Sequence, residues 1–441
     1  MKTKNILITA IAIIVFITGA NAQNVNIPDA NFKAALVSNA NINTNMDTEI
    51  QLAEANGYSG SIHVSGDSIT DLTGIEAFTS IDSLDCSENQ IVGLDVSANI
   101  ALTYLNCSSN ILVIYDINNN YTITYFMDSL DVTPNSVLTT LICSYNGLLS
   151  LNTTGLTALT YLDCNNNNRF YIDSLNNLPV FSYPILNFTT NTALTTLICS
   201  NNGLTNLNTT GFTALTYLDC YGNPLTSLNV SANTALTYLV CAVTQLTNLD
   251  VSANTALTYL NCRLNSLTSL NVSTNTALTH LSCDDNLLTS LNVSANTVLY
   301  GLVCINNQLT NLNLKNGNNI NFINFMAGNN PNLSCIEVDS AAWSASNWST
   351  SIDATAFFSE NCSGVGMNTI GQTKALQVYP NPTTSNIFLT DNSNLVLTDL
   401  AGQVLLQKTN TKQMDISVLP AGIYLLHFGQ NEKQTFKVTK Q

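Results

Sequence analysis

Apolar residues recur along most of the chain with a period of 21 residues, and short polar segments separate them. In one copy, the positions that recur with this period are Leu215, Leu218, Cys220, Asn223, Leu225, Leu228 and Val230. Around Leu218 apolar and polar residues alternate, which is typical of a short β-strand with one buried face. The rest of each copy is too short and too rich in turn and β-branched residues for a helix. The pattern predicts a β-rich solenoid with a parallel sheet on its concave face and extended or 3₁₀ segments on its convex side.

Cysteine occupies the same place in ten copies. The positions are Cys86, Cys107, Cys143, Cys164, Cys199, Cys220, Cys241, Cys262, Cys283 and Cys304. Neighbouring members are 21 residues apart except at two gaps of 36 and 35 residues, which predict insertions near 111–125 and 168–182. One cysteine per copy at an inward position indicates a small buried hydrophobe, so we expect neither a disulfide framework nor a metal site there.

Asparagine follows the cysteine by three residues in nine copies, and Thr244 takes its place in the remaining one. Each coil must turn sharply after its strand, where a short turn cannot pair all of its own backbone groups. A buried amide can bond backbone groups of its own and neighbouring turns. We therefore expect this asparagine to hold successive coils together.

The first residues have the features of a secretory signal peptide, which we place at 1–22. Lys2 and Lys4 precede an uncharged run over residues 6–20, and Ala20-Asn21-Ala22 supplies a small-residue cleavage site. A membrane anchor is the alternative, but the run falls short of the about 18 apolar residues that a span needs. We expect a secreted mature protein without a transmembrane segment.

Composition and spacing divide the rest of the chain into five segments. They are an N-terminal cap at 23–61, the solenoid at 62–330, a C-terminal cap at 331–362, a linker at 363–375 and a separate tail at 376–441. Caps are expected because the open ends of a solenoid expose its core. Cys335 and Cys362 lie outside the 21-residue frame, and in an oxidising compartment we expect them to form a disulfide that closes the C-terminal cap.

Charge is distributed unevenly between these segments. Residues 23–362 contain 24 acidic residues against only Lys33, Arg169, Arg263 and Lys315, whereas the chain from residue 363 has a small positive balance. A strongly acidic surface repels phosphate backbones and anionic headgroups, so nucleic acid is not an expected partner.

No constellation of reactive residues stands out. The three histidines lie in different parts of the chain, and the motifs of metalloproteases, serine hydrolases, nucleotide-binding loops and dinucleotide-binding folds are missing. Calcium on Asp and Asn turns is conceivable, but no known calcium-loop motif supports it. We expect a protein that is not an enzyme and that uses no cofactor and no metal.

An aromatic row three residues before the cysteine is the main candidate site. Its members are Tyr104, Tyr161, Tyr217, Tyr238, Tyr259 and His280. Tyr221 and Arg263 stand on the next outward row. Tyrosine and arginine are favoured in binding surfaces, but an aromatic ladder also stabilises strand pairing. Both interpretations stay open.

The two insertions are a second candidate, because insertions in repeat proteins often map to the binding face. Each carries several Tyr and Phe residues within polar, Asn-rich segments. The alternative is that these rings pack on one another, since the insertions lie close together along the solenoid.

The repeat follows the leucine-rich-repeat pattern with cysteine in place of its third leucine. Together with the flanking segments 27–32, 69–76 and 333–338, it resembles the internalin-like secreted leucine-rich-repeat proteins of Bacteroidetes. The resemblance implies a right-handed solenoid that serves as a recognition scaffold without catalytic residues. The insertions depart from the family pattern and break its regular register.

The tail resembles the type A C-terminal sorting domain of the type IX secretion system. The residues that carry the resemblance include Tyr379, Pro380, Asn381, Pro382, Gly402, Gly422, Tyr424, Lys437 and Lys440. Short alternating strands between turn residues predict a small C-terminal β-sandwich. The resemblance implies the secretion machinery as a partner, passage across the outer membrane, removal of the tail, and either release or attachment to the cell surface.

Two functions follow as hypotheses. The first is protein or glycan binding and adhesion by a secreted or surface-attached protein through the concave tyrosines. The second is a structural, self-associating surface protein without a specific ligand. The identity of a ligand is beyond the sequence, because repeat scaffolds bind through surface detail that no motif records.

Overall fold

The computed structural model describes residues 23–115, 121–125, 127–172, 179–362, 378–379, 382–428 and 434–441. These residues belong to two compact units, one up to Gly364 and one from Val365 onward, and each is described by itself. The expected signal peptide at 1–22, the expected linker at 363–375, and Pro380 and Asn381 lie outside the described residues.

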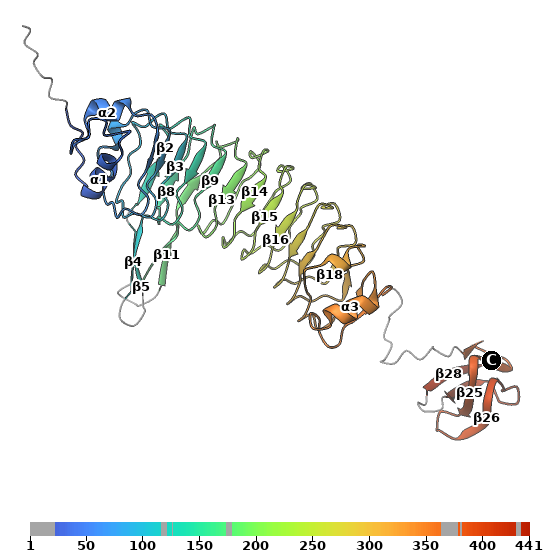
Figure 1. Cartoon of the computed structure of the whole chain (residues 1–441). Coiled ribbons are helices and arrows are strands. Elements are labelled where there is room, and N and C mark those ends of the chain that lie inside the picture. The colour runs from blue at the N-terminus through green and yellow to red at the C-terminus, as the bar shows by residue number, and fades with distance from the viewer. Residues whose placement is uncertain are drawn as a thin grey trace, which may run out of the picture. The chain divides into compact units, whose positions relative to one another are not determined.

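Two short helices, α1 (Ala30–Ser38) and α2 (Leu52–Gly57), cover the N-terminal end of the first unit (Figure 1). Asp29 caps α1 by accepting hydrogen bonds from the backbone N–H groups of Asn31 and Phe32, each at 3.0 Å. Its other oxygen accepts the Thr70 N–H at 2.9 Å and the Thr70 hydroxyl at 3.0 Å. One carboxylate thus joins the cap to the first coil.

The concave face is a twelve-stranded parallel sheet with one strand per coil. Its strands are β1 (Ser61–His63), β2 (Ser83–Asp85), β3 (Tyr104–Asn106), β7 (Thr140–Ile142), β9 (Tyr161–Asp163), β13 (Thr196–Ile198), β14 (Tyr217–Asp219), β15 (Tyr238–Val240), β16 (Tyr259–Asn261), β17 (His280–Ser282), β19 (Gly301–Val303) and β21 (Asn324–Met326). The sheet has two more strands than there are cysteine copies, because Val64 and Ala327 follow the first and last strands where the others have cysteine. The strands follow one another along a curved solenoid (Figure 1).

The strands pair in strict register, so each inward leucine meets the leucine of the next coil, as Leu218 meets Leu239. The ten cysteines lie beside this leucine row, fully buried and not joined by disulfides. Burial raises the pKa of the Cys107 and Cys262 thiols to about 12. The expectation of a small buried hydrophobe is confirmed, and these thiols have little thiolate character.

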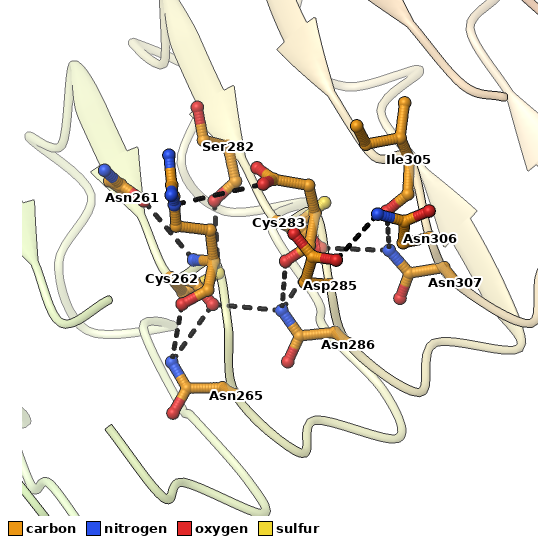
Figure 2. A network of polar contacts seen from close by, with 12 residues as sticks. Asn261, Cys262, Asn265, Ser282, Cys283, Asp285, Asn286, Ile305, Asn306 and Asn307 are labelled. Atoms are coloured by element: carbon orange, nitrogen blue, oxygen red, sulfur yellow. Dashed lines mark hydrogen bonds and ion pairs between the residues drawn. The ribbon is translucent and has the colours of Figure 1, made fainter. Parts of the chain in front are cut away.

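The asparagine three residues after the cysteine bonds two coils at once (Figure 2). The Asn286 side-chain N–H₂ donates to the carbonyls of Cys262 at 3.0 Å and Cys283 at 3.2 Å, and its Oδ1 accepts the Leu267 N–H at 3.0 Å. In the coil without this asparagine, the Thr244 hydroxyl donates to the Cys241 carbonyl. The predicted role of the asparagine row is confirmed.

The turn after each strand places one residue in the left-handed region, two positions after the cysteine. Six of the ten copies use Gly, Asn, Asp or Ser there, and the other four place Glu88, Tyr145, Val243 and Leu264 at φ values of 52° to 56°. The left-handed region is costly for a β-branched residue, because its Cβ crowds the backbone. Local strain is therefore concentrated at Val243.

A second asparagine row on the convex side was not anticipated from the sequence. Its members are Asn99, Asn135, Asn191, Asn233, Asn254, Asn275 and Asn296, all fully buried. Asn275 shows the pattern, because its side-chain N–H₂ donates to the carbonyls of Val251 at 3.0 Å and Asn254 at 2.8 Å in the preceding coil. Buried amides therefore join the coils along both edges of the core.

The rest of the convex side consists of turns and two small parallel sheets. Their strands are β6 (Ser129–Asp131), β8 (Ser150–Asn152) and β12 (Ile185–Asn187), and then β18 (Ser290–Asn292), β20 (Asn311–Asn313), β22 (Cys335–Glu337) and β23 (Phe357–Ser359). Short 3₁₀ segments occur at η1 (Ile75–Ala77) and η2 (Asn319–Asn321).

The insertions form β-hairpins: β4 (Ile111–Tyr115) pairs with β5 (Tyr121–Tyr125), and β10 (Arg169–Ile172) pairs with β11 (Pro179–Ser182). Both project from the same side of the solenoid (Figure 1). The Arg169 guanidinium lies 5.5 Å from the centre of the Tyr125 ring and forms a 2.6 Å ion pair with Asp128. The bases of the two hairpins are thereby joined. The structure does not describe most of the aromatic side chains in the insertions, so their predicted packing on one another stays a prediction.

The C-terminal end of the solenoid is closed by β23 and by α3 (Ala341–Trp348). Cys335 and Cys362 form a disulfide with their Cα atoms 5.9 Å apart. The buried Trp348 ring lies 4.5 Å from the Phe325 ring on the last strand of the long sheet. Aromatic packing of this kind shields the last coil from water.

The second unit has its own core and one five-stranded antiparallel sheet. The strands are β24 (Val378–Tyr379), β25 (Asn386–Thr398), β26 (Val404–Asp415), β27 (Gly422–Phe428) and β28 (Gln434–Lys440). The long strand β25 pairs with β26 over most of its length and with β27 over its last four residues.

Candidate functional site

The aromatic row lies at the first residue of successive concave strands. The Tyr217 and Tyr238 rings stack with centroids 4.5 Å apart and an interplanar angle of 7°, and Tyr238 and Tyr259 stack at 4.2 Å and 5°. His280 continues the row at 5.8 Å from Tyr259 in a tilted arrangement. Strict register explains the stacking, because it places equivalent residues side by side about 4.8 Å apart.

Tyr300 extends the row although the sequence reasoning missed it. Its ring meets His280 edge-on at 4.5 Å. Gly301 occupies the row position on β19, where a Cβ atom would lie 2.8 Å from Cδ2 of His280. The signal in the sequence was this glycine, which leaves space for the ring from the preceding position.

The rings of the row are half-buried, so each side chain keeps an edge in contact with solvent. Partial burial, and then the neighbouring Tyr259 and Tyr217, raise the pKa of Tyr238. The ordinary pKa of tyrosine is already near 10, so the tyrosines of the row are uncharged at physiological pH. They offer aromatic and hydroxyl groups but no charge of their own.

Tyr104 and Tyr161 are not brought into this stack. Thr140 separates Tyr104 from Tyr161, and Thr196 separates Tyr161 from Tyr217. Within the described part of the chain, ring-to-ring contacts in the row begin at Tyr217. The predicted row is therefore one stack from Tyr217 onward, preceded by two single rings.

Two of the strands that carry the row have a carboxylate two residues further along and on the same face, β9 at Asp163 and β14 at Asp219. Asp163 accepts the Asn165 N–H at 3.1 Å, and burial raises the pKa of its carboxyl group. Asp219 accepts the Ser200 hydroxyl at 2.6 Å and the Tyr221 N–H at 3.0 Å. The concave surface beside Tyr161 and Tyr217 is therefore acidic, in keeping with the composition.

Tyr221 and Arg263 stand apart from the stack, at the position after the cysteine. The side chain of Tyr221 is exposed, and its backbone N–H donates to the Asp219 carboxylate. Arg263 forms a long ion pair with Asp284, with 4.0 Å between Nε and Oδ2. Its positive charge is thus balanced locally, and the face keeps its acidic character.

In the second unit, three predicted sorting residues have structural roles. Gly402 has φ 84° in the turn between β25 and β26. The Tyr424 hydroxyl donates to the Pro420 carbonyl at 2.7 Å. The buried Lys440 ammonium donates to the carbonyls of Ser417 and Leu419 and so holds the last strand to the turn before β27.

Comparison with protein families decides what this unit is. The family described as a secretion system C-terminal sorting domain matches residues 377–440. The second unit is a type IX sorting domain. A sorting domain of this type indicates secretion and surface attachment, and it implies the secretion machinery as a partner.

The solenoid is similar to solved structures of internalins. The functional domain of InlJ from Listeria monocytogenes, whose structure is described as including a cysteine ladder, has 25% identity and a TM-score of 0.54, with 95% of this chain and 98% of that chain covered. An internalin from the same organism, InlF, has 20% identity and a TM-score of 0.50, covering 73% of this chain and 98% of that one. The solenoid therefore has an internalin-like leucine-rich-repeat fold. A comparison with curated protein sequences found no match.

Two further observations limit the chemistry of the described residues. Among them, no helix is long and apolar enough to cross a membrane. No group of three or more His, Cys, Asp or Glu side chains in the same described ranges is placed to hold a metal ion.

Proposed function

We propose that the mature protein is a recognition or adhesion protein that binds a protein or glycan partner through its concave face. The observation that carries this function is the stack from Tyr217 to Tyr300, which is only half-buried and has the Asp219 carboxylate beside its first ring. Rings that served strand pairing alone would gain from deeper burial, because apolar surface left in water contributes nothing to folding.

The fold supports the same function. Leucine-rich-repeat solenoids of the internalin type commonly bind proteins, and the curvature of a solenoid creates an extended concave surface. The sorting domain places the solenoid outside the cell, where such a surface can meet a partner. No catalytic role is part of this proposal.

A structural role is the second candidate, and the close stacking at 4.2 to 4.5 Å favours it. Stacked rings on neighbouring strands stabilise a sheet. A self-associating protein would use the row to stiffen the solenoid and would bind no specific ligand.

A capture experiment separates the two candidates. The chain from Gln23 onward is immobilised and exposed to extracellular proteins and to glycan arrays, beside a variant with Tyr217→Ala, Tyr238→Ala and Tyr259→Ala. We expect the native chain to retain a partner that the folded variant loses. If the variant melts at a lower temperature but no partner distinguishes it from the native chain, the row is a structural ladder.

A further inference from the structure

Three neighbouring strands of the concave sheet form a symmetric arrangement. Strands β9 and β14 both read Tyr-Leu-Asp, and β13 between them reads Thr-Leu-Ile. In the register, Thr196 lies between Tyr161 and Tyr217. Ile198 lies between Asp163 and Asp219 in the same way. The smaller side chain of Thr196 is therefore flanked by two rings, and Ile198 is flanked by two carboxylates.

Thr196 stands at a row position without a ring, between the rings of Tyr161 and Tyr217. Rings one strand apart are separated by 4.5 Å at Tyr217 and Tyr238. Tyr161 and Tyr217 are two strands apart, a backbone separation of about 9.6 Å from the ordinary strand spacing. A planar group needs about 3.5 Å to each neighbouring ring. One planar group therefore fits over Thr196 and would complete the stack.

The carboxylates have capacity left for a ligand. Oδ1 of Asp163 accepts from Asn165, and Oδ1 of Asp219 accepts from Ser200 and Tyr221. Across the described ranges, no donor reaches Oδ2 of either aspartate. Half-buried carboxylate oxygens favour a hydrogen-bonded partner.

The carboxylates lie close to the rings. Partial burial and then the Asp163 carboxylate raise the pKa of Tyr161. Partial burial and then Asp219 do the same for Tyr217. A group seated between these two rings would therefore experience both negative charges.

We infer that the position over Thr196 binds the guanidinium group of an arginine side chain presented by a protein partner. Guanidinium is planar and cationic, stacks on aromatic faces, and carries N–H groups that match carboxylate oxygens. Lysine carries its charge on a compact ammonium and fills the space less well. A neutral planar group would stack but would leave both carboxylates without a counter-charge. This inference rests on the proposed function and adds the chemistry of the partner.

A similar arrangement at Thr140, one strand before Tyr161, should bind a cation less tightly. Thr140 lies between Tyr104 and Tyr161, but its flanking polar residues are Asn106 and Asp163. With one carboxylate in place of two, it should bind a cation less tightly. It therefore supplies a matched comparison within the same sheet.

The test uses the chain from Gln23 onward and three synthetic peptides, acetyl-Gly-X-Gly-amide with arginine, citrulline or lysine as X. Citrulline has the shape of arginine without its charge. Binding is followed by calorimetry and by the NMR signals of ring-labelled tyrosines, assigned through Tyr161→Phe and Tyr217→Phe. We expect the arginine peptide to shift both rings and to bind about tenfold more tightly than the citrulline peptide.

Two variants locate the site. Thr196→Tyr fills the position with a residue that other copies already carry, so it should fold and lose arginine binding. Ser83→Tyr adds a ring at the same position of β2, next to Tyr104 and away from Asp163 and Asp219, so it should fold and leave arginine binding unchanged. If Thr196→Tyr melts abnormally, Asp163→Asn with Asp219→Asn takes its place and should also abolish binding. Equal binding of arginine and citrulline, or full binding by Thr196→Tyr, would overturn the inference.

Its failure can be told apart from failure of the proposed function. A partner that is lost on removal of Tyr217, Tyr238 and Tyr259 but kept by Thr196→Tyr would leave the concave face as a binding surface and remove its arginine site. Arginine binding that depends on Thr196, without any partner captured by the native chain, would preserve the site and remove the recognition function.

Discussion

The hydroxyl of Thr209 donates a 2.8 Å hydrogen bond to Oδ1 of Asn233 in the next coil. Thr153 makes the same bond to Asn191 at 2.7 Å. Other coils have valine in place of this threonine, and there the buried Oδ1 of the facing asparagine has no hydrogen-bond partner. The asparagines concerned are Asn135, Asn254, Asn275 and Asn296. The convex asparagine row is therefore completed in some coils and left open in others.

Replacing Val251 by threonine should complete the bond to Asn275. The new hydroxyl would offset the burial of a polar group, so we expect Val251→Thr to be neutral or to stabilise the fold by about 1 kcal/mol. Val293 faces no unpartnered asparagine oxygen, and Val293→Thr should destabilise by about 1 to 2 kcal/mol. Denaturant midpoints of the two variants provide the comparison, and equal losses would contradict the expectation.

Relieving the left-handed valine should also stabilise the solenoid. Val243 has φ 55°, a region that asparagine tolerates far better. We expect Val243→Asn to raise stability by about 1 kcal/mol. The reverse change, Ser109→Val at the equivalent position with φ 60°, should lower it by a similar amount. Thermal melting measures both, and a destabilising Val243→Asn would show that contacts of the valine side chain outweigh its backbone strain.

Removing one buried asparagine should be severe. Asn286→Ala deletes donors to the carbonyls of Cys262 and Cys283 and the acceptor of the Leu267 N–H. Leaving these buried groups unpaired should cost about 3 kcal/mol or more. The exposed Asn271, whose Oδ1 accepts only the Ser273 N–H, serves as the control, and Asn271→Ala should cost less than about 1 kcal/mol. If the two variants lose similar amounts of unfolding free energy in chemical denaturation, the asparagine row is not a main source of stability.

Acid should loosen the N-terminal cap through Asp29. Burial alone raises the pKa of Asp29, but hydrogen bonds from Phe32, Thr70 and Asn31 outweigh it and lower the pKa below its ordinary value. A carboxylate with a lowered folded pKa stabilises the fold above its unfolded pKa of about 3.9, and this contribution is lost as the pH falls further. The protection factors of the α1 amides, which correct for the slower intrinsic exchange in acid, should therefore fall below about pH 4. Asp29→Asn should have lower protection factors already at neutral pH and should lose little more in acid.

The sequence predicted the parts of the fold that depend on strict spacing. The cysteine period placed the coils, and the asparagine three residues later indicated its bonds to neighbouring turns. The first and last strands were not counted, because Val64 and Ala327 fill the cysteine position with residues common anywhere in a core. The convex asparagines were missed because each stands in a polar segment that reads as an ordinary turn.

The candidate site was predicted in part. Position along the strand was enough to align Tyr217, Tyr238, Tyr259 and His280, and threonine at the same position of two strands sets Tyr104 and Tyr161 apart. The ring of Tyr300 reaches the row from the preceding position, so its place in the row became visible only in the structure. The insertions show the same limit. Their polar, Asn-rich composition indicated loops, whereas backbone pairing turned them into hairpins.

The two asparagine rows constrain how a solenoid of this kind can gain or lose coils in evolution. Their bonds reach back by fixed steps, as Asn275 does to Val251 and Asn254, 24 and 21 residues earlier. Recombination that removes or duplicates one whole 21-residue copy re-forms every bond with the next equivalent carbonyl. An insertion of another length keeps the bonds when it leaves the coil as a hairpin, as Asn135 shows by bonding the carbonyls of Val96 and Asn99 across the first hairpin. The length of the concave face can therefore be inherited in units of one coil, with the chemistry of each coil free to vary at its outward positions.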